Sequence, residues 1–388
     1  MRILAVHNFY QQPGGEDAVF FTETQLLKER GHEVQRYTQH NDRLREVGRI
    51  TSARLTIWNA AVRRELRTEI RRHQPDVIHF HNTFPLISPS AYYAAQAEGV
   101  AVVQTLHNYR LLCSNALLYR DGHVCEDCVG RAIPWPGIAH ACYRGDRLAS
   151  GVVVGMLTTH RALGTWRKCV HRFIALTDFA REEFIRGGLP ADRIEVKPNF
   201  VHPDPGSGPG GGGYALFVGR LSEEKGLHTL IEAYRRVKGP PLRIVGDGPL
   251  AGEVEQAARD LPGFEWLGRQ PAEVVFELLG KAEFLVLPSE WFEGFPRVAV
   301  EAMALGTPIL ASRVGALPEI MKNGRSGRLF TPEDCHDLAN QFERMGQEAK
   351  SMRAAARSEF EARYKAEANY QILLRIYRSA QDAARARA

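Results

Sequence analysis

Two glutamates, Glu293 and Glu301, are the residues whose type and spacing say most about chemistry. They flank the turn Gly294, Phe295 and Pro296, which lies between an apolar run at 284–287 and a predicted helix. The run is typical of a buried parallel strand, and Pro296 suits the first helical position because its missing N–H needs no partner there. The N-terminus of a helix favours an anion such as phosphate. Carboxylates repel phosphate, so the two glutamates are better suited to accept hydrogen bonds from hydroxyl groups. The pattern predicts a site for a phosphate and a polyol together, as in a nucleotide sugar.

A basic loop precedes this turn in the sequence. Arg220 and Lys225 follow a predicted strand at 214–218, at its carboxyl end. Paired cations stabilise the charge that builds on a pyrophosphate leaving group, and arginine also offers bidentate geometry to phosphate oxygens. Two basic residues in a loop are usually only solvated. Here they share a predicted sheet edge with Glu293, which favours the functional interpretation.

The elements that must position these residues alternate between strand and helix. This alternation predicts α/β domains with parallel, doubly wound sheets. The Pro- and Gly-rich stretch 201–213 reads as a linker, which predicts an N-terminal domain at 1–200, a C-terminal domain at 214–365 and a terminal helix at 366–388 crossing back to the first domain. A ligand cleft is expected between the carboxyl ends of the two sheets. The predicted strands lie at 3–6, 33–37, 76–80, 100–105, 172–176, 214–218, 242–245, 265–267, 284–287 and 308–311.

Taken together, the motifs resemble those of family-four glycosyltransferases, retaining enzymes with the GT-B fold, in which two Rossmann-like domains face each other across a cleft. The resemblance spans nearly the whole chain, and its signature is the Glu-x7-Glu element from Glu293 to Glu301. It implies that Glu293 contacts the donor sugar near its reacting carbon and that Glu301 holds the ribose hydroxyls. Pro296 is a departure, since the family often has glycine there, and proline removes a backbone donor from the turn. The other donor-binding residues that the resemblance implies are Arg220 and Lys225 for the diphosphate, Gly248 and Arg269 for the wall of the nucleotide base, Gly14 and Gly15 for the N-terminal glycine loop, and the turn residues Gly294, Phe295 and Pro296.

His107 is the second catalytic candidate beside Glu293. It ends a predicted strand in the segment Thr105-Leu106-His107-Asn108, and it resembles the family's position for a histidine near the reaction centre. Such a histidine positions the donor or the incoming hydroxyl; the alternative is a structural, hydrogen-bonded histidine. His79 and His81 alternate along a predicted strand and therefore share one face, as part of the cleft wall or as acceptor contacts.

Four of the six cysteines lie close together in the sequence. Cys125 and Cys128 form a Cys-x2-Cys pair, and Cys113 and Cys142 flank it. Four thiolates at this spacing predict a closed structural zinc site, with free thiols or an iron–sulfur cluster as alternatives and with His123 or His140 as replacement ligands.

Composition and charge limit the remaining classes. The chain has 388 residues, of which 44% are hydrophobic and 24% charged, as expected for two globular domains. No apolar run reaches membrane-spanning length, and the first residues read as a strand without a signal peptide, so a cytoplasmic location is expected. Nine arginines face three glutamates between 43 and 72, which indicates either a solvated surface or a patch that contacts an anionic membrane at its inner face. No nucleic-acid motif accompanies this charge. The apolar side of the patch is expected to contain Leu55, Ile57, Trp58 and Leu66.

The expected function is a retaining hexosyltransferase of glycan biosynthesis that moves a sugar from a UDP- or GDP-sugar to an acceptor hydroxyl. The absence of an Asp-x-Asp motif and the GT-B resemblance favour a diphosphate held without a catalytic metal. The alternatives are a catalytically silent GT-B-like binding module, a phosphorylase and a sugar-nucleotide epimerase. A phosphorylase would need a cofactor phosphate site, and a silent module has no need of Arg220, Lys225, Glu293 and Glu301 together. The sequence does not identify the sugar, the base, the acceptor or the oligomeric state.

Overall fold

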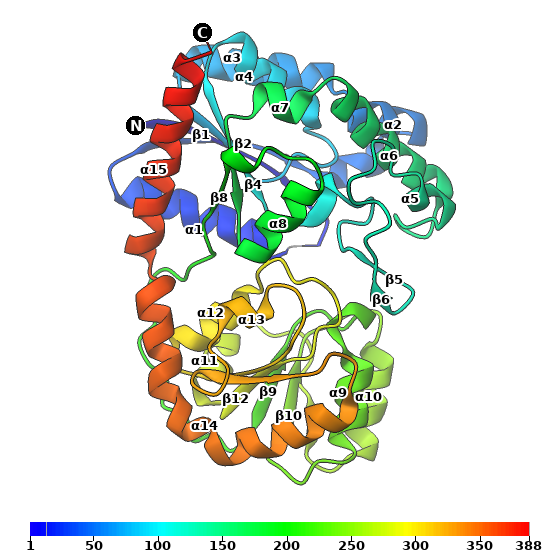
Figure 1. The fold of residues 1–388 in the computed structure, drawn as a ribbon, viewed down its shortest axis with the longest axis vertical. Helices are drawn as coiled ribbons and strands as arrows, with labels where there is room; N and C mark the ends of the chain where they lie inside the picture. The colour runs from blue at the N-terminus through cyan, green and yellow to red at the C-terminus, as the bar shows by residue number, and fades with distance from the viewer. Residues whose placement is uncertain (13, 388) are drawn as a thin grey trace. The chain divides into compact units, whose positions relative to one another are not determined.

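The computed structural model describes residues 1–12 and 14–387, and the chain divides into two compact units (Figure 1). The first unit comprises Met1–Leu118, Glu126–Pro198 and Asn369–Ala388. The second comprises Tyr119–Cys125 and Asn199–Ala368. The chain therefore passes into the second unit next to the start of the Pro- and Gly-rich stretch and returns within the last helix.

The first unit contains a six-stranded sheet in which every neighbouring pair is parallel. Parallel neighbours require a crossover between consecutive strands, and helices supply most of these crossovers. The order in the sheet changes direction between β1 and β3, where a ligand crevice is expected at the carboxyl ends of the strands. In spatial order the strands are β2 (Glu33–His40), β1 (Arg2–Phe9), β3 (Val77–Phe80), β4 (Ala101–Leu106), β7 (Arg172–Ala175) and β8 (Ile194–Val196).

Helices α1 and α15 pack against one face of this sheet (Figure 1). Phe20 and Leu27 of α1 and Leu373 and Tyr377 of α15 belong to one buried core with Ile3 of β1. The sequence thus joins the last helix to the first unit through apolar packing. The helices of this unit are α1 (Gly15–Glu29), α2 (Arg49–Ile57), α3 (Ala60–His73), α4 (Tyr92–Ala97), α5 (Pro136–Ala139), α6 (Arg147–Ala162), α7 (Thr165–Cys169), α8 (Asp178–Arg186) and α15 (Ala366–Arg385), with short 3-10 turns η1 (Asn41–Glu46), η2 (Pro89–Ala91), η3 (Tyr109–Leu111) and η4 (Ala191–Arg193).

The second unit repeats this plan with another six-stranded parallel sheet. Its order is that of a doubly wound dinucleotide-binding sheet, and the direction changes between β9 and β12. In spatial order the strands are β11 (Phe264–Trp266), β10 (Leu242–Val245), β9 (Ala215–Val218), β12 (Phe284–Leu287), β13 (Ile309–Ser312) and β14 (Gly327–Phe330). A separate antiparallel pair is formed by β5 (Tyr119–Arg120) and β6 (His123–Val124).

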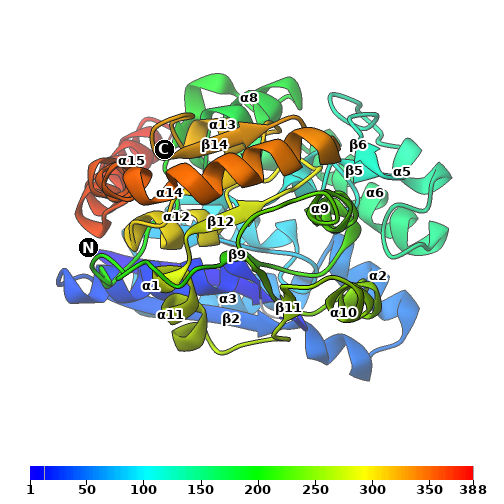
Figure 2. The ribbon, with the colours of Figure 1, turned by 90° about the horizontal axis from the view of Figure 1, so that it is seen from below.

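Helices lie on both sides of the second sheet. Figure 2 shows α9 and α10 on one side of β9 and β12, and α11 and α12 on the other. Leu230 of α9, Val254 of α10 and Phe342 of α14 share a core with Phe217 of β9. The helical elements of this unit are η5 (Glu223–Lys225), α9 (Leu227–Tyr234), α10 (Ala251–Asp260), α11 (Ala272–Lys281), α12 (Arg297–Ala304), α13 (Leu317–Ile320) and α14 (Cys335–Arg363).

All ten predicted strands are present, with ends shifted by a few residues. Two short strands of the sheets, β8 and β14, carry no clear pattern and were not predicted. The prediction that Pro296 is the first helical residue is wrong, because α12 begins at Arg297 and Pro296 is its N-cap in an extended conformation. No helix in the described part of the chain is long and apolar enough to cross a membrane.

Candidate functional site

The switch point of the second sheet brings Lys225 and Glu293 together. Lys225 ends the loop after β9, and Glu293 lies in the loop after β12. The Lys225 ammonium lies 2.6 Å from Oε1 of Glu293, and the Ser289 hydroxyl donates to the same oxygen at 2.7 Å. The Glu293 side chain is 6% exposed and that of Lys225 is 21% exposed. Two residues predicted to hold the donor therefore form a partly buried ion pair at the place where this fold binds ligands.

Gly226 explains how the two loops approach so closely. Its φ of +68° lies in the left-handed region, and a Cβ at this position would overlap the carbonyl oxygen of Pro288. Glycine is the residue that tolerates both conditions. The neighbouring Thr229 hydroxyl bonds Glu290 at 2.5 Å and further joins the two segments. The loop after β9 thus packs closely against the loop after β12, through the backbone contact at Gly226 and the hydrogen bond of Thr229.

Gly248 fits the β9 loop in the same way. A Cβ there would overlap the backbone of Leu221, and Leu250 donates a backbone hydrogen bond to the Leu221 carbonyl at 2.9 Å. The segment that was predicted to line the nucleotide base therefore packs directly on the predicted diphosphate loop.

Glu301 lies on α12, five residues along the helix. Burial raises the pKa of its carboxyl. Arg297, which forms an ion pair with it at 2.9 Å, acts in the opposite direction and lowers this pKa. In the turn before the helix, Phe295 is buried and its carbonyl accepts a hydrogen bond from the Asn199 amide at 3.3 Å. The turn is therefore fixed by its apolar side chain and its backbone, and Glu301 is held beside it.

Arg220 and Arg269 complete the basic residues predicted for the donor. Both side chains are exposed, and neither forms an ion pair with the residues that the structure describes. Gly294, in the turn that follows Glu293, is half-buried. The two arginines can bind an anion directly, whereas Lys225 must first break its ion pair with Glu293.

In the first unit, Glu16 lies at the switch point, and it was not predicted from the sequence. It follows the predicted glycine loop, in which Gly14 is the N-cap of α1 and Gly15 its first residue; Pro13 lies outside the described residues. The amides of Asn82 and Asn108 each donate to one oxygen of Glu16 at 3.1 Å. Burial and the nearby Asp17 raise the pKa of Glu16 to about 8. A carboxyl next to the Gly-Gly pair was the signal available in the sequence.

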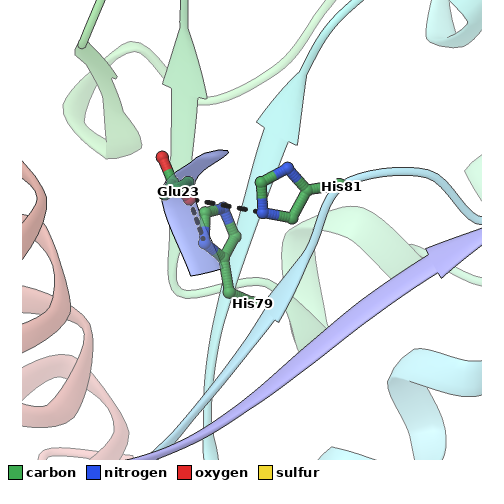
Figure 3. A group of neighbouring side chains, drawn as sticks. All are labelled: Glu23, His79 and His81. Carbon is green, nitrogen blue, oxygen red and sulfur yellow. Dashed lines mark ion pairs between the residues drawn. The ribbon is translucent and has the colours of Figure 1, made fainter. Parts of the chain in front are cut away.

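His107 follows β4 and contacts a buried polar group. Its Nε2 lies 3.1 Å from Nδ1 of His81, and the two rings are stacked with centroids 5.3 Å apart. His81 in turn contacts Glu23 of α1, as does His79, so the prediction that these two histidines share one face is confirmed (Figure 3). Lys197, directly after β8, closes the group at 2.7 Å from Glu23. Glu23 and Lys197 were not predicted to take part.

The predicted zinc site of the four cysteines is not confirmed. In the described residues, no three of their sulfur atoms lie close enough together to bind one ion. The Cys113 thiol donates instead to Asn115 at 2.9 Å. The group that does bring three metal-binding side chains together in residues 1–12 and 14–387 consists of Glu23, His79 and His81.

The predicted apolar side of the 43–72 patch is wrong for Leu66, which is fully buried in the unit. Leu55, Ile57 and Trp58 are half-buried, and Trp58 stacks on the His160 ring with centroids 5.7 Å apart. Ile50 is the large apolar side chain of the patch that is exposed, at 80%.

Comparison with known proteins supplies the family. The model described as Glycosyltransferase Family 4 matches residues 13–205, and the model described as Glycosyl transferases group 1 matches residues 212–348. An uncharacterized glycosyltransferase of Methanocaldococcus jannaschii is 38% identical over 32% of this chain and 36% of its own length. The glycogen synthase of Mycobacterium tuberculosis is 36% identical over 40% of this chain and 37% of its own length. The matches thus span less than two fifths of the length of these curated relatives.

Solved structures agree in fold along the whole chain. The Anabaena protein HepE, in complex with UDP and glucose, superposes with a TM-score of 0.66 at 18% identity, over 97% of this chain and 99% of that one. A glycosyltransferase from Rickettsia africae superposes with a TM-score of 0.69 at 16% identity, over 98% of both chains. These identities establish the fold and leave the substrate open. With two parallel sheets of this topology and two family models that follow one another along the sequence, the chain belongs to the family-four, group 1 glycosyltransferases of the GT-B fold.

Proposed function

We propose that the protein transfers a sugar from a nucleoside diphosphate sugar to an acceptor hydroxyl with retention of configuration. The observation that carries the proposal is the Lys225–Glu293 contact at the switch point of the second sheet. One residue of the pair suits a phosphate and the other suits a sugar hydroxyl, and Glu301 follows on the next helix. A nucleotide sugar has all of these groups in one molecule.

The donor's diphosphate is proposed to be bound by side chains of this chain. Lys225 and the exposed Arg220 supply positive charge at the carboxyl end of β9, where negative charge builds as the glycosidic bond to phosphate breaks. We therefore expect transfer that does not require a divalent cation. Activity that is retained after dialysis against EDTA supports this, and activity restored only by added Mg²⁺ or Mn²⁺ contradicts it.

The choice of base is proposed to be uridine or guanosine. The solved relative HepE binds UDP, and its fold matches almost all of this chain. That likeness supports UDP as the first donor base to test, with GDP beside it.

A thermal-shift titration with UDP, GDP, ADP and their sugar conjugates tests the donor site. A ligand that binds the native state raises the unfolding midpoint by mass action. We expect one base to give a selective shift that Glu301→Ala removes and that Glu277→Ala, a change at an exposed residue of α11, leaves intact. The absence of a shift with every nucleotide would overturn the proposal and favour a silent binding module.

The stereochemistry and the type of reaction need the product. Once a donor is known, NMR of the new anomeric centre shows whether the configuration of the donor sugar is retained. Inversion contradicts the retaining mechanism. Release of a sugar 1-phosphate from a glycan would indicate a phosphorylase, and an epimerised nucleotide sugar without transfer would indicate an epimerase.

A structural zinc at Cys113, Cys125, Cys128 and Cys142 stays a separate prediction, to which the thiol positions in the structure give no support. Elemental analysis of protein purified without chelators decides it. About one zinc per chain that is lost in Cys125→Ser supports the site, and no bound metal contradicts it.

Peripheral contact with an anionic membrane, at its cytoplasmic face, is likewise proposed for the 43–72 patch. Eight of its nine arginines are exposed, and Ile50 projects beside them. Sedimentation with phosphatidylglycerol vesicles is expected, decreasing with salt and absent with phosphatidylcholine. Equal recovery with both lipids contradicts the proposal.

A further inference from the structure

A buried ionic group lies behind His107 in the first unit. It consists of Glu23, His79, His81 and Lys197, and each of these residues is at most 3% exposed. Nδ1 of His79 and Nε2 of His81 lie 3.2 Å and 3.3 Å from Oε1 of Glu23. The Lys197 ammonium lies 2.7 Å from Oε2. Figure 3 shows both imidazole rings on one side of the carboxylate, pointing toward it.

This group has the donor atoms of a metal site but not its electrostatics. The ligand atoms of Glu23, His79 and His81 lie within 4.8 Å of one another. Lys197, however, already supplies the positive charge, and a divalent ion beside a buried ammonium would be repelled. Both nitrogens of His79 are also engaged, with Tyr377 at 2.9 Å and with Thr105 at 2.7 Å. The group is better explained as a fixed anion than as a cation site.

The charge of Glu23 determines where the proton of His81 lies. Burial acts to raise the pKa of Glu23, but Lys197 and His79 outweigh it and hold the pKa well below its ordinary value, so the group is an acceptor. Burial and His79 lower the pKa of His81 to about 3, so its ring is neutral and carries one proton. Nε2 lies 3.3 Å from the carboxylate without the geometry of a hydrogen bond, but a proton on it is attracted by the negative charge, whereas a lone pair there would be repelled. The neutral ring therefore keeps its proton on Nε2 and its lone pair on Nδ1.

The tautomer of His81 also determines the tautomer of His107. Its Nδ1 lone pair can only accept, so Nε2 of His107, at 3.1 Å, must donate. Burial and His81 lower the pKa of His107 well below its ordinary value, so this ring too carries a single proton. Its Nδ1 is then an acceptor, and it forms no hydrogen bond with residues 1–12 or 14–387. His107 is half-buried, so its ring is not sealed from solvent.

We propose that Glu23, neutralised by Lys197, is a positioning residue that fixes the His107 tautomer with Nδ1 as a hydrogen-bond acceptor. The ligand group that this atom recognises is a hydroxyl of the acceptor, because a phosphate oxygen has no proton to donate to it. The assignment of an acceptor hydroxyl rests on the proposed function. The tautomer itself does not.

Histidine-selective ¹⁵N labelling of the full chain tests the tautomer directly. The His107 signals are identified by their loss in His107→Asn. We expect a protonated Nε2 and an unprotonated Nδ1 in the wild-type protein, and a mixture of tautomers in Glu23→Gln, because the amide can donate as well as accept. Glu23→Asp, which keeps the charge, should restore the wild-type tautomer, and Glu29→Gln on the same helix should not change it.

Kinetics distinguish positioning from a merely structural role. With the donor identified as above, Glu23→Gln should lower kcat by about 10- to 100-fold, as for partners that orient a functional histidine. Its donor dissociation constant should stay within about 2-fold, since Lys225, Glu293 and Glu301, which are proposed to bind the donor, lie in the other unit. A wild-type His107 protonated at Nδ1, or an unchanged tautomer in Glu23→Gln, overturns the inference. If no nucleotide binds and no transfer occurs while the tautomer is as described, the proposed function fails and the proton assignment stands.

Discussion

Replacing Lys225 with methionine removes the ammonium that lies 2.6 Å from Glu293. Exposed pairs contribute about 0–1 kcal/mol, and breaking a buried pair costs about 3–5 kcal/mol. With side chains 21% and 6% exposed, this pair lies between these limits. The Ser289 hydroxyl still donates to Glu293 in the variant, which limits the loss. We expect the free energy of unfolding to decrease by about 2 kcal/mol.

A double-mutant cycle with Lys225→Met and Glu293→Gln measures the interaction in urea unfolding. Residues in contact should show coupling of about 1–2 kcal/mol, whereas independent sites add to within about 0.5 kcal/mol. Lys238→Met is the matched control, because Lys238 is exposed and its side chain forms no ion pair in the described part of the chain. Additive effects would refute the pairing of Lys225 with Glu293.

The same variant separates the stability of the pair from donor binding. A charge-assisted hydrogen bond is worth about 1.5–3 kcal/mol, so Lys225→Met should weaken binding of the nucleoside diphosphate by about 10- to 150-fold. Isothermal titration at a temperature where both proteins are folded measures the affinity. Unchanged affinity, despite a loss of stability, would show that Lys225 serves the fold and not the diphosphate.

Two further predictions concern the backbone and pH. Gly226→Ala should destabilise the second unit by about 2 kcal/mol or more and abolish nucleotide binding, since its Cβ overlaps the Pro288 carbonyl at a positive φ. The control is Gly252→Ala in α10, which has open space around it and should stabilise the protein by about 0.5–1 kcal/mol. Equal effects of the two substitutions in thermal unfolding would contradict this reasoning. The pKa of Glu16 is raised to about 8, so its proton is bound more tightly in the folded state than in the unfolded state. This contribution to stability is present below about pH 4.5 and is lost as pH rises through 8, with a slope below about 1.4 kcal/mol per pH unit because the side chain is half-buried. Glu16→Gln should flatten urea-derived stability between pH 5 and 8, and an unchanged slope would contradict the assignment.

The strands of both sheets were predictable because each buried strand is a short apolar run bounded by turn residues. The run at 284–287 is fully buried in β12, and the run at 242–245 is mostly buried in β10. A strand that is buried on both faces is apolar throughout, so its sequence shows no alternation of polar and apolar residues. β8 and β14 were missed although they are no shorter than β11, which was predicted and also carries a charged residue, so neither length nor charge explains the difference.

The donor residues were predictable from motif spacing, whereas the group behind His107 was not. Glu23 lies on α1, whereas His81 and Lys197 directly follow β3 and β8, so the three residues are widely separated in the sequence and only the strand order brings them together. In the sequence, Glu23 looks like an ordinary acid of an amphipathic helix. The one available signal was the position of Lys197, directly after a strand too short to recognise.

Each unit pairs a lysine with a glutamate near the carboxyl edge of its sheet, and their exposure separates their roles. Lys225 is 21% exposed, so it can release Glu293 to water or ligand without leaving a charge in an apolar environment. Lys197 and Glu23 are each 1% exposed, and separating them would leave two uncompensated buried charges. An ion pair that can open is suited to bind and release an anion. One that cannot open is suited to hold a neighbouring ring in a single protonation state, which is why we assign the first to the donor and the second to His107.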